Sequence, residues 1–290
     1  MARATSPITL SDLGEYNSLY LATAPVPSDP TLVWGTYVEM AAMEAFLAAY
    51  QRPDTPLVSA AHALLRAAAI ALTRYPRFNR RVVGRRVYPL DGVHLLMPML
   101  RSRGGEVDMV FLRDANSMSL AMIGTRLWEA LHEARREAER LREPGQRGDR
   151  ARRLDQWRRA LVHRLAPLGL ALSNRFRIPN FAWNERLQAT SALVNYLVFP
   201  DSPPLTFFKP STLRTNGVAV HVSLGPTRAQ VLVEEDQPVV RRVAPLFVKA
   251  DHRVVDTPQI AAFVATLRDL WHQPAQLLTP DEQHPAPPLT

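Results

Sequence analysis

One short segment near the end of the chain holds side chains suited to acid–base chemistry. Residues 250–256 read Ala-Asp-His-Arg-Val-Val-Asp, so His252 has carboxylates and a guanidinium close by in the sequence. Histidine is the side chain whose ordinary pKa suits proton transfer near neutral pH. Taken alone, a histidine at this place is more often a polar residue that ends a strand before a helix. The elements around it must therefore decide between the two interpretations.

The sequence excludes cysteine chemistry and has no motif for a metal site or a phosphate-binding loop. The chain of 290 residues has no cysteine, which excludes disulfides, Cys-ligated zinc and a cysteine nucleophile. The other histidines show no metal-ligand spacing with one another, and no glycine-rich phosphate loop is present. We therefore expect no metal. The beginning of the chain has no apolar signal region, and no window approaches the ~18 to 20 apolar residues of a membrane span. We expect a soluble, cytoplasmic protein.

The positive charge is concentrated in one segment. The formal net charge is +8, and nearly all basic residues are arginines. Most of the excess falls between residues 135 and 164, where acidic residues alternate with the arginines as they do along a solvated helix. Nucleic-acid binding is therefore not expected. These helices could instead cover an oligomer surface or dock a protein partner.

The periodicity of apolar residues predicts one α/β domain with an insert. An irregular N-terminal arm covers residues 1–31, the domain covers 32–278 with a helical insert at 143–187, and a disordered proline-rich tail covers 279–290. Thr257 is predicted to cap the last helix, with Pro258 at its first position. Strands are predicted at 32–38, 82–90, 93–100, 107–112, 191–199, 218–224, 229–234 and 239–248, and helices at 39–50, 57–75, 120–141, 150–165 and from 257 onward.

The segment at 250–256 resembles the His-x-x-x-Asp-Gly signature of the dihydrolipoamide acyltransferases of 2-oxo acid dehydrogenase complexes. The catalytic domain of that family shares its fold with chloramphenicol acetyltransferase. Four further segments resemble the family in the same order along the chain. They are Thr36-Tyr37-Val38-Glu39-Met40 (a first core strand), Pro76 to Val82 (a Pro-x-x-Asn turn), Arg113 to Leu120 (Arg-Asp-Ala-Asn before a long helix) and Val239 to Leu246 (the strand before the histidine).

The resemblance implies a fold and a set of site residues. The implied fold is a chloramphenicol-acetyltransferase-like α+β two-layer sandwich, with a mixed sheet and helices. His252 would be a neutral general base that takes a proton from a thiol. Asp256 would anchor the loop by pairing with an arginine, with Arg253 a candidate. The family places an oxyanion-stabilising hydroxyl in a strand where this chain has Val194, so the Asn195 amide, or Thr190 or Ser191 in a shifted alignment, is the candidate donor.

The resemblance also implies an activity and an assembly. We expect a stand-alone, CoA-dependent acyltransferase that moves an acyl group between a thioester and a thiol, hydroxyl or amine. CoA or acyl-CoA would be its substrate, with a lipoyl or carrier-protein thiol as a further possibility. The active site would lie at the interface of a homotrimer, which could build a higher assembly. Because Val194 and Thr257 depart from the family pattern, a catalytically silent scaffold is the alternative.

Overall fold

The computed structural model describes residues 30–51, 57–83, 86–100, 107–142, 189–198 and 218–283, together with scattered helical positions between 149 and 168. A seven-stranded mixed sheet forms its centre, with the strand order β1-β9-β7-β6-β4-β5 and with β8 paired to β9. The strands are β1 (Thr31–Glu39), β4 (Leu95–Leu100), β5 (Val107–Leu112), β6 (Ala192–Tyr196), β7 (Val220–Leu224), β8 (Arg228–Glu234) and β9 (Gln237–Asp251).

The middle of the sheet is parallel and its flanks are antiparallel. β6 runs parallel to both β4 and β7, whereas β9 is antiparallel to β1, β7 and β8. A separate two-stranded sheet pairs β2 (Arg80–Val83) with β3 (Arg86–Pro89). The predicted single strand at 82–90 is therefore two short strands, and the bend expected at Gly84 lies outside the described residues.

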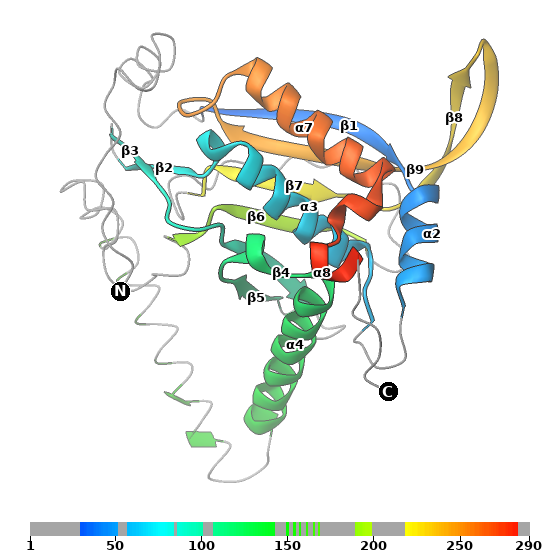
Figure 1. Cartoon of the computed structure of the whole chain (residues 1–290). Coiled ribbons are helices and arrows are strands. Elements are labelled where there is room, and N and C mark those ends of the chain that lie inside the picture. The colour runs from blue at the N-terminus through cyan, green and yellow to red at the C-terminus, as the bar shows by residue number, and fades with distance from the viewer. Residues whose placement is uncertain are drawn as a thin grey trace.

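Helices cover one face of the main sheet (Figure 1). They are α2 (Ala41–Tyr50), α3 (Ala60–Arg74), α4 (Leu120–Arg142) and α7 (Thr257–His272). Most of the buried residues of α3 are alanines, whose small side chains allow close packing. Phe78, Phe263 and Trp271 fill the larger gaps, and all three are almost completely buried. The predicted combination of a mixed sheet with helices is confirmed. Among the described helices, none is long and apolar enough to span a bilayer.

The opposite face of the sheet is also buried in its centre. Leu96, Leu193 and Val218 form a small apolar cluster there, against Phe111. Alternate positions of β6, β7 and β9 place polar side chains on this same face, and they too are buried. A sheet that is buried on both faces explains why β7 has no exposed residue.

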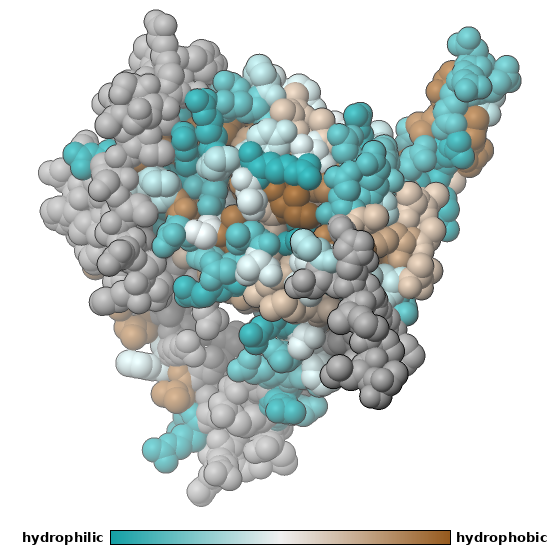
Figure 2. Space-filling view, in the orientation of Figure 1, coloured by the Kyte–Doolittle hydropathy of each residue, from teal (hydrophilic) through white to brown (hydrophobic). Residues whose placement is uncertain are grey.

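β8 and the first half of β9 extend beyond the body of the molecule as a ribbon (Figure 1). Glu235 and Asp236 form its turn, both in the left-handed region with φ of 48° and 62°. Two consecutive residues with positive φ are typical of the hairpin turn whose twist matches that of the strands. Hydrophobic and hydrophilic areas lie side by side on the ribbon surface (Figure 2), and Val231, Val233 and Val240 are exposed.

One predicted boundary changes. The tail expected to be disordered from residue 279 begins with a short helix, α8 (Pro280–Gln283), and Tyr50 donates a hydrogen bond from its hydroxyl to Glu282 at 2.6 Å. Residues 284–290 lie outside the described part, as do residues 1–29 of the predicted arm. The described positions of the predicted insert are helical, and its apolar stripe of Leu154, Trp157, Leu161 and Leu165 is exposed.

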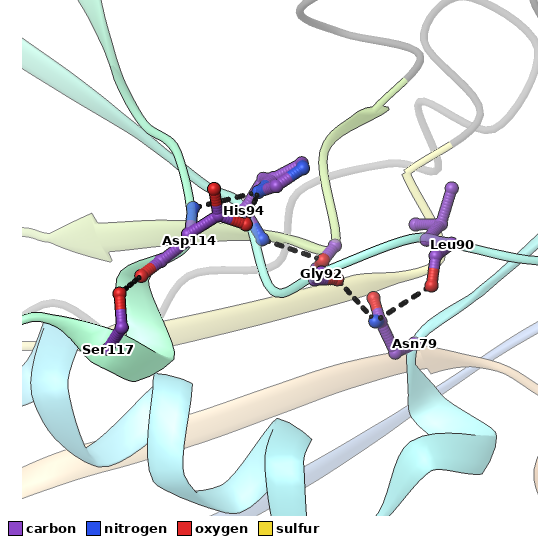
Figure 3. A network of polar contacts seen from close by, with 7 residues as sticks. Asn79, Leu90, Gly92, His94, Asp114 and Ser117 are labelled. Carbon is purple, nitrogen blue, oxygen red and sulfur yellow. Dashed lines mark hydrogen bonds and ion pairs between the residues drawn. The ribbon is translucent and has the colours of Figure 1, made fainter. Parts of the chain in front are cut away.

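A polar corner before β4 joins two of the motif segments (Figure 3). Asn79, which follows a 3-10 turn, donates from its amide to the Gly92 carbonyl oxygen at 2.7 Å. Gly92 has a φ of 72°, and a Cβ at this position would lie 2.5 Å from Asp114 Oδ1, so any other residue would be strained here. The backbone N–H of Asp114 donates to His94 Nδ1 at 2.9 Å. The Pro-x-x-Asn and Arg-Asp-Ala-Asn segments therefore meet and fix the start of β4.

His94 holds this corner in its neutral form. Its Nδ1 accepts the Asp114 N–H, so that nitrogen carries no proton, although the Asp114 carboxylate lies 3.5 Å away. Burial lowers the pKa of His94 below its ordinary 6.5, and Arg113 adds to this effect while Asp114 and Asp91 oppose it. The hydrogen bond and the lowered pKa agree on a neutral ring, so the contact with Asp114 is not an ion pair near neutral pH.

We expect His94 to make the fold sensitive to acid. Because its pKa is lower in the folded than in the unfolded chain, its contribution is complete above about pH 6.5 and is lost as the pH falls toward the lowered folded value. His94→Asn keeps an acceptor for the Asp114 N–H but cannot ionise. Denaturant unfolding at several pH values should show a shallower acid loss in the variant than in the wild type. Identical slopes in the two proteins would contradict this role of His94.

Candidate functional site

His252 begins the turn that links β9 to α7, and its ring is held in one tautomer. Its Nδ1 lies 2.9 Å from the Val255 carbonyl oxygen. A carbonyl only accepts, so Nδ1 carries the proton and Nε2 keeps a lone pair. The backbone N–H of His252 donates to the Pro30 carbonyl at 2.7 Å, which ties the turn to the residue before β1. The side chain is largely buried, with 9% of the residue exposed.

An ion pair inside the turn fixes its shape. Asp251 is fully buried, and the Arg253 side chain donates to both of its carboxylate oxygens at distances of 2.7 to 3.2 Å. The backbone N–H of Arg253 donates to the same carboxylate at 3.0 Å. A bidentate guanidinium is the geometry that best compensates a buried carboxylate. His252 therefore lies between two residues that are locked to each other.

The predicted role of Asp256 needs correction. Arg253 pairs with Asp251, so the anchoring ion pair involves a different aspartate from the one expected. Asp256 is instead the N-cap of α7. It accepts the Gln259 N–H at 3.1 Å, while the Gln259 side chain accepts the Asp256 N–H at 3.2 Å. This reciprocal capping box fixes the start of α7 immediately after the turn.

The cap at Asp256 also explains how Thr257 can replace the glycine of the family signature. Thr257, the predicted cap, is the first helical residue, and the observed cap lies one place earlier, at Asp256. Among the described non-glycine residues, positive φ angles occur only at Asp114, Glu235 and Asp236. Thr257 therefore does not adopt the left-handed conformation in which a β-branched residue is costly.

The candidate oxyanion residues of β6 point to opposite faces of the sheet. Val194 faces the helices and is completely buried in the apolar core. Asn195 faces the other way, and its amide donates to the Ser223 hydroxyl at 3.0 Å, with 6% and 5% of the two residues exposed. Ser191 is occupied elsewhere, because its hydroxyl accepts the His94 N–H at 2.9 Å. Ser223 is thus a hydroxyl beside Asn195 that sequence comparison missed.

The polar band continues along this face toward the His252 turn. His221 and Lys249 are a register pair of β7 and β9, two positions from Ser223 and Phe247, and both are buried. Sequence reasoning did not single them out. Their signal was the alternation of apolar and polar residues in β7, which is typical of a strand with two different faces.

The structure does not bring His252 and Asn195 together within one chain. Asn195 is in register with Ser223, and Ser223 with Phe247. His252 follows the end of β9 and lies five positions after Phe247, which is roughly 16 Å of extended chain. The predicted site residues therefore form two clusters: the turn with His252 and Asp256, and the pair of Asn195 and Ser223. In the described part of the chain, no three histidine or acidic side chains gather in a way that could hold a metal ion.

Comparisons with known proteins bear out the resemblance. The family of 2-oxoacid dehydrogenases acyltransferase (catalytic domain) matches residues 207–279, which include the turn of His252 but not Asn195. No curated protein sequence matches the chain.

Solved structures of this type are similar over most of the chain. A dihydrolipoamide acetyltransferase of Azotobacter vinelandii has a TM-score of 0.61 at 15% identity, covering 94% of this chain and 93% of its own. The cubic core of a pyruvate dehydrogenase multienzyme complex has a TM-score of 0.60 at 15% identity, with coverages of 94% and 92%. A chloramphenicol acetyltransferase has a TM-score of 0.52 at 16% identity, with coverages of 92% and 99%. At these identities the likeness establishes the predicted chloramphenicol-acetyltransferase-like fold.

Two substitutions should separate the ion pair from the helix cap. Arg253→Ala leaves the Asp251 carboxylate buried without its partner, so we expect a loss of about 3 kcal/mol in the free energy of unfolding. Asp256→Ala removes only an N-cap and should cost about 1 kcal/mol. Asp256→Asn, which can still cap, is the matched control and should be close to the wild type. Denaturant titration measures all three variants.

A larger loss for Asp256→Ala than for Arg253→Ala would restore Asp256 as the anchor of the turn.

Proposed function

We propose, from an acyltransferase fold and a family match that spans the histidine turn, that this chain transfers acyl groups between CoA and a thiol, hydroxyl or amine with His252 as general base. The observation that carries the proposal is the contact between His252 Nδ1 and the Val255 carbonyl oxygen. It leaves the lone pair on Nε2, which a base needs. In the Azotobacter enzyme, a serine, a histidine and an asparagine four positions after that histidine have been investigated for their roles in catalysis. Asp256 is likewise four positions after His252.

The proposed reaction uses His252 twice. Nε2 takes the proton of the acceptor thiol, hydroxyl or amine as its S, O or N atom attacks the thioester carbonyl carbon. The tetrahedral intermediate then collapses, its original C–S bond breaks, and the proton on Nε2 passes to the leaving CoA sulfur. An imidazole suits both steps, because near neutral pH it can accept a proton in the first and release it in the second. The Asp251–Arg253 pair would act only by holding the turn, so these two are positioning residues.

The pair of Asn195 and Ser223 is the proposed oxyanion donor. The amide of Asn195 already donates to Ser223 Oγ, which orients the hydroxyl and leaves its proton to be donated elsewhere. Asn195 would therefore act through Ser223. This assignment replaces the missing hydroxyl at Val194, whose side chain lies on the wrong face. Removing one oxyanion donor typically costs about 10²–10³ in rate.

Both clusters can serve one reaction only if two copies of the chain meet. The separation of roughly 16 Å within a chain exceeds any hydrogen-bond distance. A homotrimer, as the family resemblance implies, would place the His252 turn of one copy against the Ser223 face of the next. The exposed stripe of Leu154, Trp157 and Leu161 in the insert supports a further contact, either within the trimer, in a larger assembly or with a protein partner.

A silent scaffold is the second candidate. The observation that favours it is Val194, an apolar residue buried in the core where the family pattern has a hydroxyl. Such a protein would keep the fold and the assembly and would transfer no acyl group. Activity measurements separate the two candidates.

His252→Ala should lower acyl transfer from acetyl-CoA to dihydrolipoamide by about 10²–10⁴, because the general base is lost. His272→Ala is the matched control, since His272 is exposed at the end of α7. Initial rates are measured on proteins checked for unchanged size and unfolding temperature. Equal rates for wild type and His252→Ala would rule out this base, and a wild type inactive with every short acyl-CoA would favour the scaffold.

Ser223→Ala should lower kcat by about 10²-fold with little change in KM, as expected for a group that acts on the intermediate. Val194→Ser should lower stability without raising the rate, because its hydroxyl would enter the apolar core. Steady-state kinetics on both variants test the assignment. A rate gain in Val194→Ser would place the donor at that position instead.

Light scattering should give a mass about three times the 32.5 kDa of one chain. The physical reason is that a composite site requires a neighbour to complete it. An active monomer would contradict the shared site while leaving the fold unaffected.

A further inference from the structure

A pocket of about 570 Å³ opens on the helix-covered side of the sheet. It lies between the start of α3, the middle of α4 and the ends of β4 and β6. Met97 and Met99 of β4 and Leu127 and Trp128 of α4 form much of its wall. The volume is typical of small-molecule sites, which span about 300–1,000 Å³. His252 does not line this pocket, so it is separate from the proposed active site.

The polar side chains of the pocket are all uncharged. Among the described residues that line it, none is an Asp, Glu, Lys or Arg, and the polar side chains are Ser59, His62 and Tyr196. Burial raises the pKa of Tyr196, which keeps its phenol protonated near neutral pH. The pocket therefore offers hydrogen bonds but no charge that could compensate an ionic group.

His62 is held as a hydrogen-bond donor. The backbone N–H of Ser59 donates to His62 Nδ1 at 2.9 Å, and the Ser59 hydroxyl lies at the same distance from that nitrogen. Burial lowers the pKa of His62, so the ring is neutral near pH 7 and its proton lies on Nε2. Within the described part of the chain, no acceptor is recorded for this N–H.

We propose that this pocket binds an uncharged small molecule with an apolar body and a carbonyl or similar oxygen that accepts a hydrogen bond from His62 Nε2. Methionine and tryptophan side chains supply the apolar contact. His62 is half-buried and lines the pocket, so its Nε2–H can donate to an oxygen of a ligand bound there. A carboxylate ligand would lose its hydration without finding a cation, which is strongly unfavourable. The inference concerns binding alone and does not depend on acyl transfer.

The test uses 2-nonanone and nonanoate, which have the same number of carbons, as probes in calorimetric titrations of the full chain without CoA at about pH 8. The ketone should bind at least tenfold more tightly than the carboxylate. Met99→Trp, which fills the pocket, should abolish ketone binding. Met122→Trp is the matched control, because Met122 is exposed on α4 outside the pocket and its variant should bind like the wild type.

His62→Phe tests the hydrogen bond, and it should weaken ketone binding roughly two- to tenfold, the value of one hydrogen bond. The inference is overturned if the ketone does not bind to the wild type, if nonanoate binds as tightly, or if Met99→Trp binds the ketone unchanged. A loss of oligomer mass in Met99→Trp, together with no ketone binding to the wild type, would instead assign the pocket to a second copy of the chain. Acyl-transfer rates enter none of these outcomes, so a failure here is distinct from a failure of the proposed function.

Discussion

Asp251 must keep a negative charge inside the core, and the turn after β9 is built around that requirement. A carboxylate with no exposed surface is tolerated only when donors surround it. Arg253 provides them from two positions away, using its guanidinium and its own backbone N–H. The chain must turn sharply for this, and His252 lies within that turn. The direction of the imidazole is therefore a by-product of how a buried charge is neutralised, and the Val255 carbonyl completes it.

β9 connects this turn to the rest of the sheet. It hydrogen-bonds to β1 along one edge and to β7 and β8 along the other, so its end cannot move independently of the sheet. The capping box of α7 fixes the far side of the same turn. Rigid elements on both sides are what a catalytic histidine requires, because small displacements reduce the efficiency of proton transfer.

The fold could be predicted from the sequence to a large extent, and the site only in part. Apolar periodicity located most strands and helices, and short motifs placed His252 at a strand–helix junction. The partner of Arg253 could not be predicted, because two aspartates lie within three residues of it and only the turn geometry selects Asp251. Ser223 was missed because it pairs with Asn195 across strands, and no spacing in the sequence encodes that register. The face to which Val194 points could not be predicted either, because it depends on the pleat of β6.

The order of the strands in the sheet has a consequence for how the protein forms. Thr31 pairs with Asp251, some 220 positions later in the chain. β9, which joins β1 to β7, is therefore among the last strands to leave the ribosome. Until β9 is present, β1 and β7 each lack a partner along one edge. Joining them through β9 closes a long loop, which has an entropic cost. High contact order slows folding, and exposed edges favour association between chains. The main sheet can therefore close only once β9 is present to pair with both β1 and β7.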